Sequence, residues 1–81
     1  MHYVYLIESV HEPLQRYVGH TDDLKRRLWE HNEGKSPHTA KHRPWNLVSY
    51  HAFPSEKRAV EFERYLKSGS GRAFAKRHLG F

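Results

Sequence analysis

The sequence contains no cysteine among its 81 residues. Disulfide bonds and thiolate chemistry are therefore excluded, and a cytoplasmic location is favoured. No apolar run approaches the ~20 residues that a membrane-spanning helix needs, and the N-terminal stretch "MHYVYLIES" is too short and too polar at its flanks for a signal peptide. We expect one small domain over residues 1–81 and no membrane partner.

Several signatures of cofactor and metal chemistry are also missing. The chain has no glycine-rich phosphate loop and no serine nucleophile elbow, so we expect no small-molecule cofactor. His31, His38 and His42 raise the question of zinc. However, there is no cysteine and no HExxH motif, and Pro37 and Pro44 frame the last two histidines in a loop. Structural zinc is disfavoured.

The net charge of the chain is positive. Lysine and arginine total 14 against 9 acidic residues, which gives a net charge of +5 and a pI near 9.7. Eight histidines add positive charge as the pH falls toward their reference pKa of about 6.5. An excess of this size favours a polyanionic partner, most plausibly nucleic acid, but it also suits a surface that serves solubility alone.

Periodicity and turn residues predict three strands and three helices. The expected strands span residues 3–8, 16–19 and 47–53, and the expected helices span residues 21–34, 56–69 and 70–81. Thr21 or Asp22 is expected to cap the first helix and Gly34 to end it. The order β-β-α-β-α-(α) predicts an α/β (α+β) fold, in which helices flank a three-stranded, mainly antiparallel sheet.

Hydrophobic side chains at helical spacing predict which helix faces are buried. In the first helix these are Leu24 and Leu28, with Trp29 as an addition. In the second helix they are Ala59, Phe62 and Leu66, and in the tail Phe74 and Leu79 are expected to pack back on the core.

A single acid interrupts the apolar stripe of the second helix. Glu63 is either partly buried and in need of a cation, or it forms an ordinary surface pair with Lys67 four residues on. Arg27 and His31 stand four apart on one flank of the first helix, whereas Arg26 points elsewhere. Such a pair suits a phosphate, although a solvated basic helix would also explain it.

Five spaced segments, taken together, indicate more than each does alone. They are "YVY" at 3–5, "YVG" at 17–19, "DLKRRLWEHNEG" at 23–34, "RPWNLV" at 43–48 and "AVEFERYLK" at 59–67. In this order they resemble the GIY-YIG nuclease domain in its small stand-alone form, and the resemblance covers nearly the whole chain. One departure is Tyr3, which stands where the family's first tripeptide has glycine, and a second is Val18 in place of isoleucine.

The resemblance implies a metal-dependent DNA endonuclease. It places the catalytic set on Tyr5, Tyr17, Arg27, His31 and Glu63. Glu63 would hold one divalent cation, Mg²⁺ or another such as Mn²⁺, and Arg27 would hold the scissile phosphate. A tyrosine would activate the attacking water with help from His31. We take Tyr17 for this role, and the resemblance leaves Tyr5 open as the alternative.

Basic residues outside this set are expected to follow the DNA backbone. The candidates are Lys35, Lys41, His42 and Arg43 in the loop, and Lys67, Arg72, Lys76 and Arg77 toward the C-terminus. Two alternatives remain: a nucleic-acid-binding module with little or no cleavage of its own, and a partner-binding subunit of a DNA repair complex. If the nuclease interpretation is right, burial of both apolar helix stripes should bring the five catalytic candidates to one shallow concave site on the sheet.

Overall fold

The computed structural model describes residues 1–81 and contains the three strands and three α-helices that the sequence predicts. The strands are β1 (His2–Ser9), β2 (Arg16–Thr21) and β3 (Trp45–Phe53). The α-helices are α1 (Leu24–Asn32), α2 (Glu56–Leu66) and α3 (Gly69–His78), and a short 3-10 helix, η1 (Ala40–His42), precedes β3.

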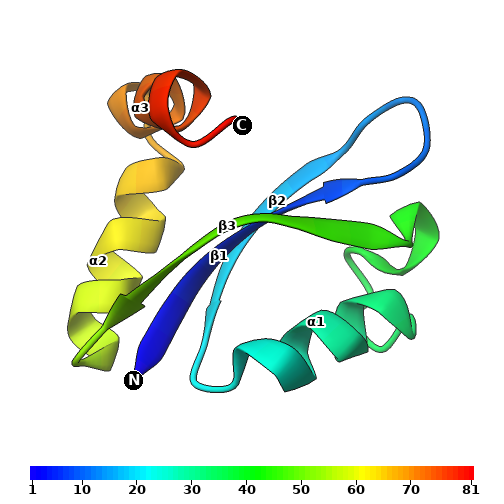
Figure 1. The fold of residues 1–81 in the computed structure, drawn as a ribbon, viewed down its shortest axis with the longest axis horizontal. Helices are drawn as coiled ribbons and strands as arrows, with labels where there is room; N and C mark the ends of the chain where they lie inside the picture. The colour runs from blue at the N-terminus through cyan, green and yellow to red at the C-terminus, as the bar shows by residue number, and fades with distance from the viewer.

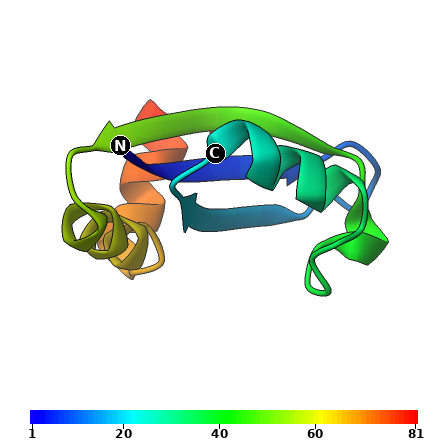
Figure 2. The same cartoon turned by 90° about the horizontal axis from the view of Figure 1, so that it is seen from below.

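The sheet is antiparallel throughout, with β1 between β2 and β3 (Figure 2). Helix α1 lies on one side of the sheet, and α2 and α3 lie on the other (Figure 1). Because side chains alternate along a strand, each strand serves both layers. The register pairs Tyr5 with Gly19 and Ile7 with Tyr17, so Tyr5 and Tyr17 share the face that α1 covers.

Each face of the sheet builds its own hydrophobic cluster. Val4 and Leu6 pack with residues of α2 and α3, namely Ala59, Leu66 and Ala75. Phe62, Phe74 and Leu79 are partly buried against this first cluster, as the sequence predicted. On the other face, Tyr5 and Ile7 pack with Trp45, and Leu24 and Leu28 of α1 close over them.

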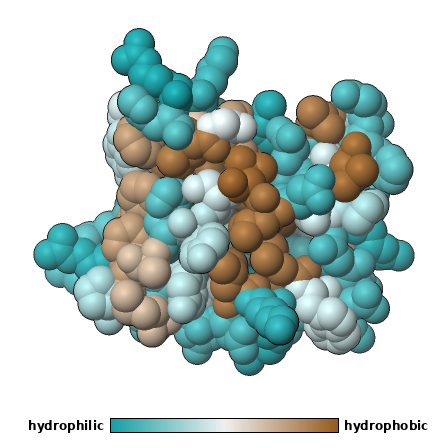
Figure 3. All heavy atoms as spheres, viewed as in Figure 1, coloured by the Kyte–Doolittle hydropathy of each residue, from teal (hydrophilic) through white to brown (hydrophobic).

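The surface is predominantly hydrophilic around a central apolar band. Figure 3 shows hydrophobic side chains gathered over the middle of one face, with hydrophilic side chains around them. No helix has both the length and the apolar composition that crossing a bilayer requires.

The predicted buried face of α1 is wrong in part. Leu24 and Leu28 are only half-buried and Trp29 is 55% exposed, whereas His31 is fully buried. A histidine can occupy a core position when both ring nitrogens have partners, and those of His31 do. The helix is therefore rotated toward its Arg27/His31 flank compared with the stripe that hydrophobicity alone suggests.

Several boundaries also differ from the prediction: β3 begins at Trp45 rather than at residue 47, and α2 ends at Leu66 rather than at residue 69. Strand β2 does not end at Gly19 but continues to Thr21, because the ladder with β1 runs on to the pair Tyr3–Thr21. The N-cap of α1 is Asp23, whose carboxylate accepts from the amide of Arg26; Thr21 instead accepts from the Asp23 amide. Gly34 follows the helix with a φ of 76°, the left-handed conformation that glycine adopts without strain.

Candidate active site at the edge of strand β2

Tyr5, at the centre of the sheet, joins Arg27 and His31 of α1 in one hydrogen-bonded chain. The Tyr5 hydroxyl lies 2.8 Å from Nε2 of His31 and accepts from Nε of Arg27 at 3.4 Å. Nδ1 of His31 lies 2.7 Å from Oγ1 of Thr39, whose hydroxyl donates to the carbonyl of Ser36 at 3.5 Å. This direction of donation puts the His31 proton on Nδ1 and leaves Nε2 to accept from Tyr5.

Burial keeps both members of the Tyr5–His31 pair neutral. Burial lowers the pKa of His31 to about 4, and the positive charge of Arg27 acts in the same direction. Burial raises the pKa of Tyr5 to about 12, and this effect outweighs the hydrogen bond and positive charge of Arg27, which act to lower the pKa. Near neutral pH the hydrogen bond therefore joins two uncharged groups.

Arg27 stays positively charged, and one nitrogen of its guanidinium has no hydrogen-bond partner within the chain. Burial lowers the pKa of Arg27, but its hydrogen bonds to Glu30 and Tyr5 outweigh burial and raise it overall. Nη1 donates to Glu30 at 2.9 Å, and Nη2 makes no hydrogen bond within the chain. The neighbouring Arg26 is more exposed and pairs with Asp22 and Glu30 on the outer surface. The two arginines thus differ in environment, as the helical spacing predicted.

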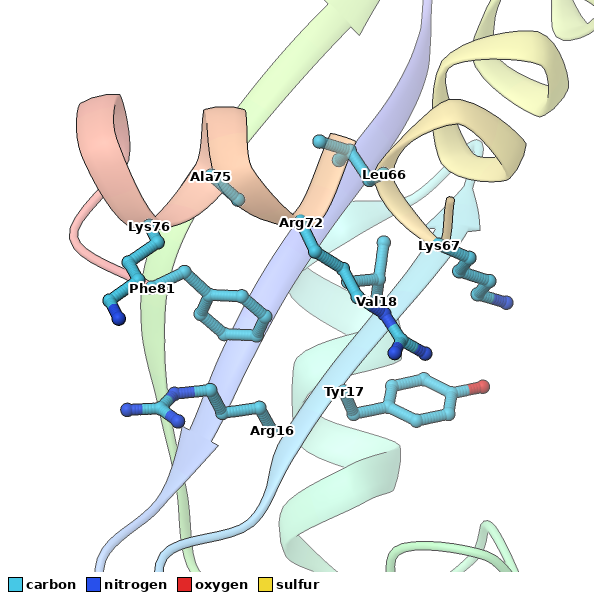
Figure 4. A pocket seen from close by; sticks show the side chains of 9 residues that line it. All are labelled: Arg16, Tyr17, Val18, Leu66, Lys67, Arg72, Ala75, Lys76 and Phe81. Carbon is cyan, nitrogen blue, oxygen red and sulfur yellow. The ribbon is translucent and has the colours of Figure 1, made fainter. Parts of the chain in front are cut away.

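Tyr17 lies beside this chain and opens to solvent. Its ring centroid is 6.3 Å from that of Tyr5 and 5.3 Å from that of His31. Gly19 makes the close packing possible, since a Cβ there would come within 2.5 Å of the Tyr5 hydroxyl. Tyr5 itself is only 1% exposed, whereas Tyr17 lines a surface pocket with Lys67 (Figure 4).

Glu63 approaches the same strand from the other layer. One of its carboxylate oxygens binds Nδ1 of His20 on β2, and the other accepts from Nζ of Lys67 at 2.6 Å. Burial raises the pKa of Glu63, but Lys67 and His20 outweigh burial, so that the pKa is lowered and the carboxylate is ionised. The surface pair with Lys67, the simpler of the two interpretations of Glu63, therefore does form.

The predicted convergence needs one correction. Tyr5, Tyr17, Arg27 and His31 do come together, but Glu63 does not lie on their face of the sheet. It pairs with His20, which points to the opposite face from Tyr17 and Gly19 because side chains alternate along β2. The two sets approach each other around the edge of β2, where Tyr17 and Lys67 line one pocket. The candidate site therefore lies at the β2 edge of the sheet and takes residues from both faces.

Glu63 is the one candidate metal ligand in this region. No three histidine, aspartate or glutamate side chains are grouped closely enough to hold a metal ion between them. An ionised, partly buried carboxylate is nevertheless the oxygen donor that a hard divalent cation prefers. The Lys67 side chain is 53% exposed, and water can solvate its amine if a cation takes its place, so Glu63 fits a cation with water in the rest of its shell.

The basic residues fall on two separate surfaces. Lys35, Lys41 and Arg43 are exposed around η1 and the end of α1, and His42 is half-buried there. Lys35 lies over the Trp29 ring at 5.9 Å, and Arg43 donates to the Ala40 carbonyl at 3.2 Å. The C-terminal residues do not extend this loop, because their helices cover the other side of the sheet (Figure 1). Of these, Lys67, Arg72 and Lys76 line one pocket and Arg77 lines another.

Sequence reasoning missed the residues that support the candidates. Thr39 holds the buried nitrogen of His31, His20 holds Glu63, and Gly19 gives Tyr5 its space. The alternation of β2 and the glycine between Tyr17 and His20 could have indicated the last two. Nothing local indicates Thr39, because its partner is eight residues away across a loop.

The chain is similar to known proteins. Residues 1–77 match the family model described as the GIY-YIG catalytic domain. The chain is 39% identical over 83 residues to "Structure-specific endonuclease subunit SLX1" of Candida dubliniensis, covering 94% of this chain but only 28% of that protein. The chain thus spans less than a third of that relative's length.

Smaller relatives match over more of their own length. A UPF0213 protein of Haloquadratum walsbyi is 38% identical over 68 residues, covering 83% of this chain and 74% of that protein. The solution NMR structure of a UPF0213 protein from Bacillus halodurans superposes with a TM-score of 0.58 at 32% identity, over 98% of this chain and 86% of that one. The family model spans most of the sequence, and the chain therefore belongs to the GIY-YIG nuclease family.

Proposed function

We propose that residues 1–81 act as one divalent-metal-dependent endonuclease domain that hydrolyses phosphodiester bonds in DNA. The observation that carries this proposal is the hydrogen-bonded chain of Arg27, Tyr5 and His31 beside Tyr17, with an ionised Glu63 at the same strand edge. Membership of a nuclease family supports it, as does the likeness to the Candida dubliniensis endonuclease subunit.

Arg27 is the group that we assign to the scissile phosphate. Its Nη2 is free of hydrogen bonds within the chain, while Tyr5 and Glu30 hold the rest of the guanidinium in place. A guanidinium fixed in this way before substrate binds needs little reorganisation to stabilise the charge that grows on the phosphate oxygens. Tyr5 and His31 therefore act as positioning residues for Arg27.

Tyr17 is the tyrosine that we assign to the attacking water. The Tyr5 hydroxyl is enclosed by Arg27 and His31, whereas Tyr17 opens to a surface pocket. Exposure thus supports the choice of Tyr17 over Tyr5. The Tyr17 hydroxyl would hydrogen-bond the water and orient it for in-line attack, since contact with the water is the first requirement of such a group.

Glu63 is the group that would hold the cation, with water as the other ligands. A cation bound there supplies positive charge for the phosphate and the leaving 3′ oxygen. Lys67 must first release the carboxylate oxygen that it occupies. His20 keeps the other oxygen fixed and so sets the direction of the carboxylate.

A second function has its own support in the structure. The same chain would be a DNA-binding module with little cleavage of its own if Lys67 holds Glu63 permanently, because the pair satisfies the carboxylate without a metal. The cationic surfaces would then be the functional part of the protein.

A nuclease assay run beside a binding assay separates the two functions. Duplex, flap and branched DNA are incubated with the protein in Mg²⁺, in Mn²⁺ and in EDTA, and binding is measured by fluorescence anisotropy. The nuclease proposal expects cleavage of at least one substrate with either cation and none in EDTA. Tight binding without cleavage of any substrate under all three conditions would overturn it in favour of the binding module.

A further inference from the structure

A pocket lies between β2, α2, α3 and the C-terminal tail. It has a volume of about 570 Å³, within the usual range of small-molecule pockets. Figure 4 shows side chains of β2, α2, α3 and the tail around it, with the amines of Lys67 and Lys76 extending outward at its rim. The nine lining residues are Arg16, Tyr17, Val18, Leu66, Lys67, Arg72, Ala75, Lys76 and Phe81.

The floor of the pocket is apolar and firmly held. Leu66 and Ala75 belong to the hydrophobic core, and Val18 and Phe81 pack against them. The backbone amide of Phe81 donates to the Ala75 carbonyl at 3.2 Å, which ties the tail to α3. The Arg16 guanidinium lies over the Phe81 ring, 5.7 Å from its centre, so a base stacked on that face would take the place of the guanidinium. The pocket therefore offers a base both an aromatic ring and a fixed apolar surface.

The rim of the pocket is cationic, and some of its cations form no ion pair within the chain. Four of the nine lining residues are basic and none is acidic. Arg16 pairs with Glu8 and Lys67 with Glu63, but Arg72 and Lys76 take part in none of the ion pairs of the chain. Figure 4 shows the Arg72 guanidinium between Val18 and Tyr17, inside the pocket. Unpaired cations suit the phosphates of a nucleotide, and the apolar floor suits its base.

We propose that this pocket binds one unpaired nucleotide of the DNA substrate, with its base against Phe81 and its phosphates on Arg72 and Lys76. The inference rests on the proposed function for the identity of the substrate, and it adds a substrate class: DNA with an unpaired nucleotide next to the bond that is cut. Tyr17 and Lys67 line the pocket, and Lys67 also binds Glu63. A nucleotide seated there places the adjoining phosphate near the candidate catalytic residues.

Binding of a single nucleotide tests the pocket without any need for cleavage. Thymidine 3′,5′-bisphosphate, its analogue without a base, and uridine 3′,5′-bisphosphate are titrated in EDTA and followed by the NMR shifts of the Val18, Ala75 and Phe81 amides. We expect the thymidine compound to bind at least ~5-fold more tightly than the analogue without a base, the lower end of what stacking one base contributes. Equal affinities would reduce the pocket to a cationic patch. Tighter binding of the uridine compound would overturn the assignment to DNA.

Matched variants locate the two halves of the nucleotide. Phe81→Ala should weaken the thymidine compound at least ~5-fold and leave the analogue without a base unchanged. Arg72→Ala should weaken both by similar factors. Lys57→Ala is the control, since this exposed cation on α2 does not line the pocket. If all three variants bind like the wild type, the site is wrong.

Cleavage assays then keep this inference apart from the proposed function. If the variants change nucleotide binding as expected but no DNA is cleaved, the nuclease proposal is wrong and the pocket proposal holds. If the protein cleaves both blunt duplex and duplex with a single-stranded extension, and Phe81→Ala changes neither rate, the nuclease proposal holds and the pocket proposal is wrong. If both proposals hold, Phe81→Ala should slow cleavage of the extended duplex and spare that of the blunt one.

Discussion

The hydroxyl of Tyr5 lies 2.8 Å from Nε2 of His31, although 26 residues separate the two in the chain. This contact fixes the position of α1 on the sheet, because both side chains are almost fully buried and each satisfies a polar group of the other. It also places Arg27 where its guanidinium reaches the same hydroxyl. The packing of the fold and the chemistry of the candidate site therefore depend on the same pair.

The pKa of His31 predicts a loss of stability in mild acid. The pKa is about 4 in the folded chain against 6.5 for a free histidine, so the unfolded state binds more protons between these values. Stability should therefore be fully present above pH 6.5 and fall as the pH drops toward 4, by roughly 3 kcal/mol for 2.5 pKa units.

Urea unfolding at pH 7, 5.5 and 4.5 measures this loss. The His31→Gln variant, which cannot titrate at this position, should lose much of the decrease seen in the wild type. His38→Gln, an exposed loop substitution, is the control and should keep it. An identical decrease in all three proteins would show that His31 is not the group responsible.

Gly19 should tolerate no side chain. A Cβ there would meet the Tyr5 hydroxyl at 2.5 Å and the ring carbon that bears it at 2.7 Å, so Gly19→Ala must displace the Tyr5 ring. We expect a loss of about 1–3 kcal/mol of unfolding free energy, as for other overpacked cores. Gly69→Ala, where a Cβ meets nothing within 4 Å, should cost nothing. Thermal or urea unfolding compares the two, and equal effects would contradict the packing described here.

Arg27 and Arg26 should separate in their effects on cleavage. Arg27→Ala should slow cleavage by at least ~100-fold, about the value of one transition-state donor. Arg26→Ala, on the outer surface of the helix, should change mainly the salt-sensitive affinity for DNA. Single-turnover rates and binding curves at several salt concentrations distinguish the two results. Similar modest losses at both positions would favour a merely solvated basic helix.

The loop around η1 should bind the DNA backbone without reading bases. Replacing Lys41 and Arg43 with alanine should weaken binding to unrelated sequences by similar factors. It should also flatten the dependence of log K on log salt by about 0.9 for each duplex phosphate that the variant no longer neutralises. Anisotropy titrations from low to high salt on two unrelated duplexes give both quantities. An altered sequence preference with an unchanged salt slope would mean that these residues bind bases.

The sequence was sufficient for the order of elements and for much of the site. Alternation in "YVY" and "YVG" and the spacing of Arg27 and His31 depend on local chemistry, so each could be predicted from a few residues. The five catalytic candidates came from the family resemblance, and their roles stay predictions. Local patterns could not predict the burial of His31. It depends on hydrogen bonds from its two ring nitrogens to Tyr5 and Thr39, and only the fold brings these residues to His31.

The position of Glu63 shows the same limit. Its i,i+4 partner Lys67 could be read from the helix, but its contact with His20 depends on the register of β2. We expected burial of both apolar helix stripes to bring all five candidates to one concave site, and this expectation is wrong for Glu63. Side-chain alternation along β2 puts Tyr17 and His20 on opposite faces, and the site lies at the strand edge because of it.

The most direct test of the central claim is the cleavage of DNA by Glu63→Gln in Mg²⁺, with DNA binding measured in parallel. Glu61→Gln, an exposed acid two residues earlier on α2, is the matched control. The account predicts that Glu63→Gln binds DNA nearly as the wild type does but does not cleave it, while Glu61→Gln cleaves normally. Cleavage by Glu63→Gln at the wild-type rate would contradict the assignment of Glu63 to the metal and, with it, the site at the edge of β2.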